Sequence, residues 1–252
     1  MNEFRKRGRT GWALLLAVLL AAPAAWGGPS SESEERTVDE SGRTVTREFD
    51  LRGFDSLDIS AAFEVDLRQE DTYSVVVRID EAFLSDLRVV MTGSLLRIGF
   101  RPGLRINTRG NRPYASVSLP DLKRLELSGA ALARLADFRL DRDLELALSG
   151  ASSVEGALEA RDLRIEASGA SDLLLRGAAR DLELDGSGAS TIELEELEVQ
   201  DARVELSGAS SATVLAAGRL DLQASGASHL YYLGSPTMGK IETSGASSIG
   251  QK

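Results

Sequence analysis

The 252-residue chain has no cysteine, one histidine (His229) and few aromatic residues, 5% in all. Without cysteine it forms no disulfide, has no thiol nucleophile and offers no N-terminal cysteine for lipid attachment. A single histidine excludes a metal site built from several histidines and permits one serine triad at most. Because aromatic rings are scarce, we expect a core filled mainly by Leu, Val, Ile and Ala.

Positive charge is also in short supply. The chain has 29 Lys and Arg against 39 Asp and Glu, which gives a formal net charge of −10. Binding to nucleic acid depends on Lys and Arg that neutralise phosphates, so we expect no nucleic-acid partner. Hydrophobic residues make up 42% of the chain, which excludes wholesale disorder and is enough for a sizeable core.

Long apolar runs are confined to the N-terminus. Basic residues at 5–9 precede an apolar segment at 12–22 and the small residues of "AAPAAWGG". This order predicts a signal peptide over 1–27, since the apolar segment is shorter than the roughly 20 residues of a spanning helix. We therefore expect export to the periplasm, the cell surface or the medium, with no membrane span after cleavage; an uncleaved anchor is the alternative.

Two segments separate the signal peptide from the rest of the chain. Residues 28–43 are polar and acidic, which predicts a flexible leader. Residues 44–119 alternate apolar and polar positions, as in "FDSLDISAAFEVDLRQ" and "YSVVVRI", and we predict a small antiparallel β unit there. Within it, "DEAFLSDLRVVM" is consistent with a short helix or with a turn before a strand.

Residues 120–252 contain an internal repeat. Ser-Gly-Ala occurs seven times, at intervals of 18 to 21 residues. The serines and glycines of the seven copies are Ser128, Gly129, Ser149, Gly150, Ser168, Gly169, Ser187, Gly188, Ser207, Gly208, Ser225, Gly226, Ser244 and Gly245. Repeats of this length indicate a stacked architecture in which each unit contacts its neighbours.

The residues around each copy predict two short strands and a bend. The third residue before each serine is apolar in every copy: Leu125, Leu146, Ile165, Leu184, Val204, Leu222 and Ile241. The fifth residue after it is apolar as well: Ala133, Val154, Leu173, Ile192, Ala212, Leu230 and Ile249. Polar residues lie between apolar ones with a period of two, as in a strand with one buried face.

At the bend itself, glycine permits a positive φ, and we expect the small alanine to keep the backbone from crowding the interior. The serines can bond local backbone groups. Stacking these units buries their apolar faces, so we predict an all-β protein, a parallel β-helix of about seven rungs. A helical solenoid is disfavoured by the repeat length and by the period of two. A leucine-rich repeat is disfavoured because this chain lacks the asparagine or cysteine that follows the strand in such repeats.

The order of segments also resembles a known family. "GFDSLDISAAFEVDLRQ", "YSVVVRIDEAFLSDLRVVMTGSLLRIGF" and "VSLPDLKRLELSGAA", followed by serial "SGAS", are similar to the putative auto-transporter adhesin head GIN domain family, a domain of unknown function in exported bacterial proteins. The likeness covers about residues 48–249. It implies a right-handed parallel β-helix, an N-terminal β-strand cap region over 44–119 and export in bacteria, and it implies no established activity.

Few side chains suggest specific chemistry. His229 occupies a position that is polar in the other copies, so we expect it to be exposed. Tyr231 and Tyr232 are the one aromatic pair of the repeats; together with His229 they could contact a partner, or they could pack the end of the column. Arg-Asp pairs recur in successive copies and predict ladders of ion pairs along one edge: Arg142, Asp143, Arg161, Asp162, Arg180 and Asp181. Solvated pairs of this kind add little stability.

Taken together, these features predict a noncatalytic, exported, adhesin-like binding or scaffold protein that needs no cofactor or metal. A glycan, an envelope protein or a second copy of the chain are the candidate partners. The alternative is a carbohydrate-active lyase or hydrolase, which would need convergent carboxylates in a groove. The even spacing of the repeats leaves little loop from which to build one, so we predict that the protein is not an enzyme.

Overall fold

The computed structural model of the chain describes residues 36–107 and 111–252. The predicted signal peptide and the first half of the predicted leader lie outside these residues. Strands make up 65% of these described residues, which confirms the all-β prediction. A 3-10 turn, η1 (Glu81–Phe83), precedes strand β6 (Leu87–Thr92), so the segment from residue 81 to 92 is a short helical turn followed by a strand.

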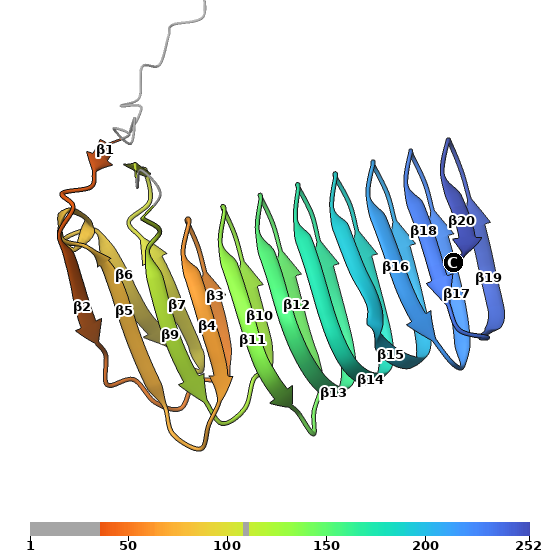
Figure 1. Cartoon of the computed structure of the whole chain (residues 1–252), viewed down its shortest axis with the longest axis horizontal. Coiled ribbons are helices and arrows are strands. Elements are labelled where there is room, and N and C mark those ends of the chain that lie inside the picture. Colours follow the sequence, from red (N-terminus) through yellow and green to blue (C-terminus); the bar gives the residue numbers. More distant parts are fainter. Residues whose placement is uncertain (1–35, 108–110) are drawn as a thin grey trace, which may run out of the picture. The chain divides into compact units, whose positions relative to one another are not determined.

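The chain winds into a right-handed β-solenoid of about six turns (Figure 1). In each turn one strand leads to a bend, which is Ser-Gly-Ala-Ser in most turns, and a second strand leads away from it. The strands before the bends form the pre-bend sheet: β3 (Ser56–Ile59), β10 (Arg124–Leu127), β12 (Leu144–Leu148), β17 (Arg219–Ala224) and β19 (Thr237–Thr243).

The strands after the bends form the post-bend sheet: β4 (Glu64–Gln69), β11 (Leu132–Arg139), β16 (Ser211–Ala216), β18 (His229–Leu233) and β20 (Ser248–Gln251). Three long strands continue from one sheet into the other: β13 (Ser153–Ala167), β14 (Asp172–Gly186) and β15 (Thr191–Leu206). Their first halves belong to the post-bend sheet and their last halves to the pre-bend sheet.

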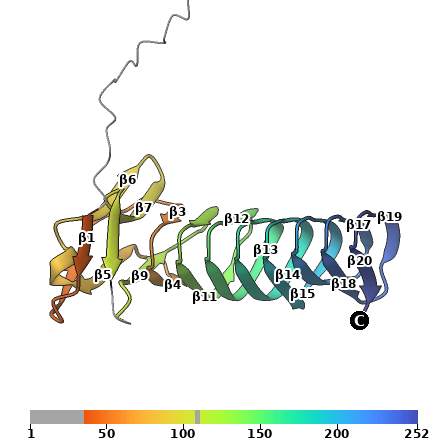
Figure 2. The same cartoon turned by 90° about the horizontal axis from the view of Figure 1, so that it is seen from above.

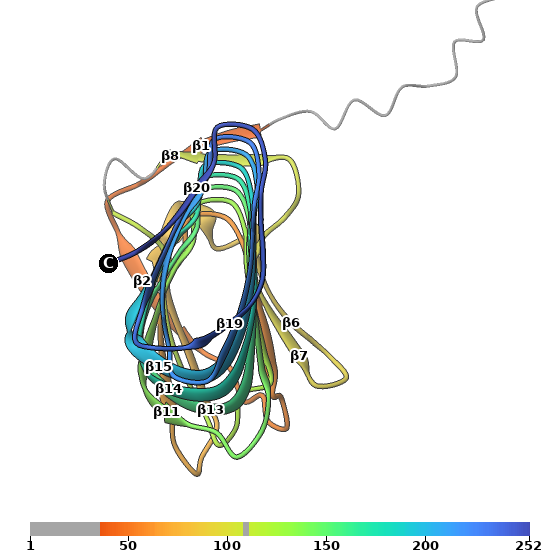
Figure 3. The same ribbon diagram turned by 90° about the vertical axis from the view of Figure 1, so that its right-hand side faces the viewer.

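Successive turns pair in parallel and place like positions above one another. Leu125 lies opposite Leu146, and Val154 lies opposite Leu173. A view along the column shows the turns superimposed, with two long sides (Figure 3). The apolar positions predicted from the repeat are buried, which confirms the predicted strand faces, except in the last turn. There Ile241 is 50% exposed, because β19 pairs on one side only, with β17, among the described residues.

The N-terminal strands combine parallel and antiparallel pairing (Figure 2). Antiparallel pairs join β5 (Ser74–Asp80) to β2 (Thr44–Glu48) and to β9 (Tyr114–Leu119), and join β6 to β7 (Leu95–Phe100). However, β7 and β9 pair in parallel with β3 and β4 and so extend the solenoid. The prediction of an antiparallel unit over 44–119 is therefore right for β2, β5 and β6 and wrong for β3 and β4.

The physical reason is a first bend that lacks glycine. Between β3 and β4 the chain turns at Ala61, which has a positive φ of 67°. The carbonyl of Ala61 accepts a hydrogen bond from the N–H of Ala130 at 2.9 Å, the same contact that joins later bends. Because alanine replaces glycine here, the repeat in the sequence becomes visible one turn later than the repeat in the structure.

The end of the predicted flexible leader is also ordered. Strand β1 (Arg36–Asp39) pairs in parallel with β8 (Leu104–Asn107), and Val38 packs against the core. The buried carboxylate of Asp80 then accepts hydrogen bonds from Ser41, from the N–H of Gly42 and from the N–H of Ala82. Burial raises the pKa of Asp80, but these hydrogen bonds outweigh it and lower the pKa below 3.8.

Candidate functional site

The glycine of each bend is required for two reasons. The seven glycines have φ between 71° and 79°, a conformation that costs a residue with a Cβ about 1–2 kcal/mol. From the second copy on, an added Cβ would also lie 2.3–2.6 Å from the carbonyl oxygen of the glycine in the preceding turn. That oxygen accepts the N–H of the next alanine at 2.7 Å. Glycine therefore sets both the turn and the close stacking of the bends.

The fourth residue of the bend, a serine in most turns, fills the interior. Its hydroxyl donates to the carbonyl of the first serine of the same bend at 2.7–2.9 Å. These serines are buried: Ser152, Ser171, Ser190, Ser210 and Ser228. The alanines before them are exposed, so the fourth residue of the bend, and not the alanine, occupies the interior. Serine can be buried here because its own bend satisfies its hydroxyl.

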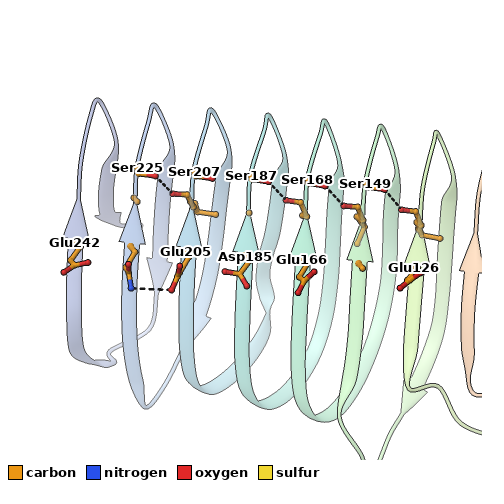
Figure 4. A pocket seen from close by; sticks show the side chains of 18 of the residues that line it. Glu126, Ser149, Glu166, Ser168, Asp185, Ser187, Glu205, Ser207, Ser225 and Glu242 are labelled. Carbon is orange, nitrogen blue, oxygen red and sulfur yellow. Dashed lines mark hydrogen bonds between the residues drawn. The ribbon is translucent and has the colours of Figure 1, made fainter. Parts of the chain in front are cut away.

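The first serine of the bend stays at the surface and touches the preceding turn. Its hydroxyl lies 3.2–3.5 Å from a carbonyl of that turn in four bends: those of Ser149, Ser168, Ser187 and Ser225. Figure 4 shows these serines in one row near the bends and the carboxylates in a second row along the strands. Each hydroxyl oxygen keeps acceptor capacity for a ligand.

A groove of about 1280 Å³ runs between these two rows along the pre-bend sheet. We call it the repeat groove. One side is lined by the first serines of the bends: Ser128, Ser149, Ser168, Ser187, Ser207, Ser225 and Ser244. The other side is lined by outward-facing residues two positions earlier: Glu126, Ala147, Glu166, Asp185, Glu205, Gln223 and Glu242. Asp58 extends this second row, and no lysine or arginine belongs to the described lining.

A column of alternating charge flanks the groove. The residues four positions before the bend serines lie in register in successive turns: Arg124, Glu145, Arg164, Glu183, Arg203 and Asp221. Arg164 pairs with Glu183, with Glu166 at 3.0 Å and with Asp185 at 3.6 Å. Burial raises the pKa of Asp185, Glu205 and Glu183 raise it further, and Arg164 only partly opposes them.

The predicted ion-pair ladders form on another part of the pre-bend sheet. Arg161 pairs with Asp143 at 2.7 Å, and Arg180 pairs with Asp162 at 2.7 Å, so each arginine reaches the aspartate of the preceding turn. The hydrogen bond from Arg161 lowers the pKa of Asp143. The side chains of these pairs are largely exposed, and the charged groups neutralise one another, as expected for ion pairs on a solvated edge.

His229, Tyr231 and Tyr232 lie on β18, in the post-bend sheet, away from the repeat groove. His229 is exposed, with Nδ1 2.8 Å from the hydroxyl oxygen of Ser248. Tyr231 is 40% exposed, and Tyr232 packs against the core. A partner surface at these residues stays a prediction. The groove acids were missed from the sequence, although a polar residue stands two positions before almost every bend serine.

The described residues contain neither a clustered set of metal ligands nor a membrane-spanning helix. Residues 36–107 and 111–252 contain no group of three or more histidine or acidic side chains placed to hold a metal ion. In the same part of the chain, no helix has the length and apolarity to cross a bilayer.

These features define a β-solenoid protein with a repeated polar surface. A model of the family described as "Putative auto-transporter adhesin, head GIN domain" matches residues 53–236. The chain belongs to this family, which confirms the resemblance seen in its sequence. No curated protein matches the sequence.

Solved structures share the fold. A "putative adhesin" from Bacteroides fragilis NCTC 9343 is 17% identical, with a TM-score of 0.76 over 85% of this chain and 100% of its own. A "putative lipid binding protein" from Parabacteroides distasonis ATCC 8503 is 18% identical, with a TM-score of 0.71 over 86% and 100%. A "putative adhesin" from Parabacteroides merdae ATCC 43184 is 16% identical, with a TM-score of 0.63 over 86% and 99%. At these identities the likeness concerns the fold.

Proposed function

We propose that the protein is a noncatalytic, exported, adhesin-type binding protein that holds a linear polysaccharide along the repeat groove. The observation that carries this proposal is the groove itself, which continues past seven bend serines and offers an acidic or amide side chain beside each of them except at the turn of Ala147. Such a surface suits a ligand that also repeats. Membership of the adhesin family supports binding rather than catalysis, and the N-terminal sequence supports export.

The spacing of the groups favours a sugar chain over an extended peptide. Neighbouring strands lie about 4.8 Å apart, so the groove repeats its hydroxyl and its acidic or amide group at about that distance. One pyranose ring of a linear polysaccharide advances by a similar length, so successive sugars meet equivalent groups. An extended peptide advances about 3.3–3.4 Å per residue and falls out of step with the turns.

The chemistry of the lining also agrees with a glycan. Carboxylate oxygens and serine hydroxyls are hydrogen-bond partners for sugar hydroxyls. The first serine hydroxyls make only long contacts within the protein, at 3.2–3.5 Å where they bond the preceding turn. A lipid, which the name of the P. distasonis protein suggests for that protein, fits less well, because an acyl chain would meet carboxylates at most turns of the groove.

The arrangement of the carboxylates argues against hydrolysis. Glycosidases place their two carboxylates on either side of the bond that is cleaved. In the repeat groove the carboxylates form one row on one side, with serines on the other side. A similar set recurs turn after turn, so no single bond is marked for attack.

The test measures binding and cleavage together. The mature protein is applied to immobilised cellulose, xylan, chitin, chitosan, alginate and polygalacturonate, and released sugars are assayed in parallel. We expect retention on at least one polymer without product. The variant Ala147→Trp, which fills the groove, should abolish retention, and Ala157→Trp on the post-bend sheet should not.

The binding assay and the cleavage assay can each refute the proposal. Retention on no polymer, or equal retention of both tryptophan variants, would refute the groove as the binding site. Release of sugars by the wild-type chain would refute the noncatalytic proposal. Circular dichroism of both variants shows whether the solenoid is intact.

A further inference from the structure

Charge in and beside the repeat groove follows a pattern with a period of two turns. The flanking column alternates between bases and acids from one turn to the next. Where this column carries a base, the groove carries a glutamate: Glu126, Glu166, Glu205 and Glu242. Where the column carries an acid, the groove is uncharged at Ala147 and Gln223. Asp185 breaks the pattern, because it follows the acidic Glu183 on the same strand.

Asp185 therefore lies in a local excess of negative charge. Glu166 and Glu205 stand opposite it on the neighbouring turns, and Glu183 precedes it on β14. Arg164 is 3.6 Å away and also serves Glu166 and Glu183. The next base, Arg203, pairs with Glu205. Three carboxylates thus surround Asp185, and the bases nearby are already shared.

The negative charge of Asp185 does not stabilise the folded protein. The pKa of Asp185 lies above 3.8 in the folded protein, first because of burial and then because of Glu205. A carboxyl whose pKa is raised by folding opposes folding when it is ionised, so Asp185 lowers stability at neutral pH. Residues that lower stability are characteristic of functional sites, because the side chains that bind a ligand are not those that would make the fold most stable.

We propose that the repeat groove selects polysaccharides that carry free amines, with Asp185 as the specificity-determining residue. The inference rests on the proposed function and names its ligand class. An ammonium group of a hexosamine unit would lie beside Asp185 and its neighbours and would supply the positive charge that the protein does not. Uronic and phosphate-bearing polymers would be repelled, since the described lining holds six carboxylates and no base.

The repeat of the groove agrees with a β-1,4-linked chain of this kind. Successive rings in such a chain are turned over, so equivalent substituents recur at every second sugar. The glutamates of the groove also recur at every second turn, with Ala147, Asp185 and Gln223 between them. Chain and groove thus share a two-unit period. With one inward-facing amine at Asp185, the others fall at the turns of Ala147 and Gln223, so Asp185 is the carboxylate that faces an amine directly in this register.

The experiment compares chitosan and chitin oligosaccharides of equal length, which differ in whether the nitrogen is a free amine or an acetamide. Isothermal titration calorimetry is run slightly below neutral pH, where glucosamine amines are protonated. Chitosan should bind more tightly than chitin. Asp185→Asn should weaken chitosan binding about two- to fivefold, as expected for a partly exposed ion pair, and should weaken chitin binding less, so that the preference for chitosan over chitin falls.

The matched control is Asp172→Asn, the same substitution on the same strand but on the post-bend sheet. It should leave both affinities unchanged. Equal binding of the two sugars, no effect of Asp185→Asn or an equal effect of Asp172→Asn would overturn the inference; if Ala147→Trp still abolished binding, the proposed function would stand. Binding of neither sugar, nor of any polymer in the broader panel, would refute the proposed function itself.

Discussion

Replacing Gly169 by alanine tests whether the bends are stacked as closely as the structure shows. Gly169 has φ +79°, and a Cβ there would lie 2.4 Å from the carbonyl oxygen of Gly150. That oxygen accepts the N–H of Ala170 at 2.7 Å, so relieving the clash means moving two stacked bends apart. The positive φ alone costs about 1–2 kcal/mol, and overpacking adds about 1–3 kcal/mol. We expect Gly169→Ala to lower the free energy of unfolding by about 2–5 kcal/mol.

Gly53→Ala separates the two contributions. Gly53 has φ +80°, almost the value of Gly169, but nothing lies within 4 Å of an added Cβ. In this variant the free energy of unfolding should therefore fall only by the cost of the positive φ, about 1–2 kcal/mol. Urea unfolding followed by circular dichroism gives both values on the same chain, provided that the m-values agree. Equal losses in the two variants would refute the close stacking of the bends.

Three further predictions concern the bend serines, the N-terminal strands and the groove. Ser190→Ala removes a buried hydroxyl that donates at 2.9 Å to the carbonyl of Ser187, and should cost about 0.5–1.5 kcal/mol in thermal or urea unfolding; no loss would contradict this role. Asp80→Asn should cost about 1.5–3 kcal/mol at neutral pH. The pKa of Asp80 is lowered by folding, so its stabilisation is present above pH 3.8 and lost as the pH falls through the folded value. The wild type and this variant should therefore converge in acid, and a constant difference would contradict the assignment. In calorimetry, oligosaccharide affinity should rise with length up to about one sugar per bend serine, seven in all, and then level off; a plateau at two or three sugars would indicate a small local site.

Much of the solenoid could be predicted from the sequence because its bends demand a glycine. The requirement recurs at each turn, so the spacing of glycines gives the length of a turn, and the period of two gives the buried face. The rule fails at Ala61, where a bend forms without glycine and the first turn is hidden. The alternation of apolar and polar residues shows that β3 and β4 each have one buried face. It does not show whether the neighbouring strands pair with them in parallel or antiparallel.

The site was less predictable than the fold. Alanine and serine are both small, so composition does not show which of them faces the interior at the bend. Serine takes the interior position because its hydroxyl donates a hydrogen bond to the first carbonyl of the same bend. This contact can be recognised only in the three-dimensional structure. The groove acids, such as Glu166 and Asp185, look like the ordinary polar face of a strand. That this face is hollow next to the bends follows from how the turns stack.

In-register stacking of the bends can be tested most directly with a disulfide, since the native chain has no cysteine to interfere. Ala151 and Ala170 are exposed and occupy the same position in adjacent bends, with Cα atoms about 4.8 Å apart, inside the range that a disulfide spans. The double variant Ala151→Cys/Ala170→Cys should close an intramolecular disulfide on mild oxidation. Ala151→Cys/Ala189→Cys, two turns apart at about 9.6 Å, should retain free thiols. Failure of the first pair to close, or equal closure of the second, would contradict the stacked solenoid on which the groove depends.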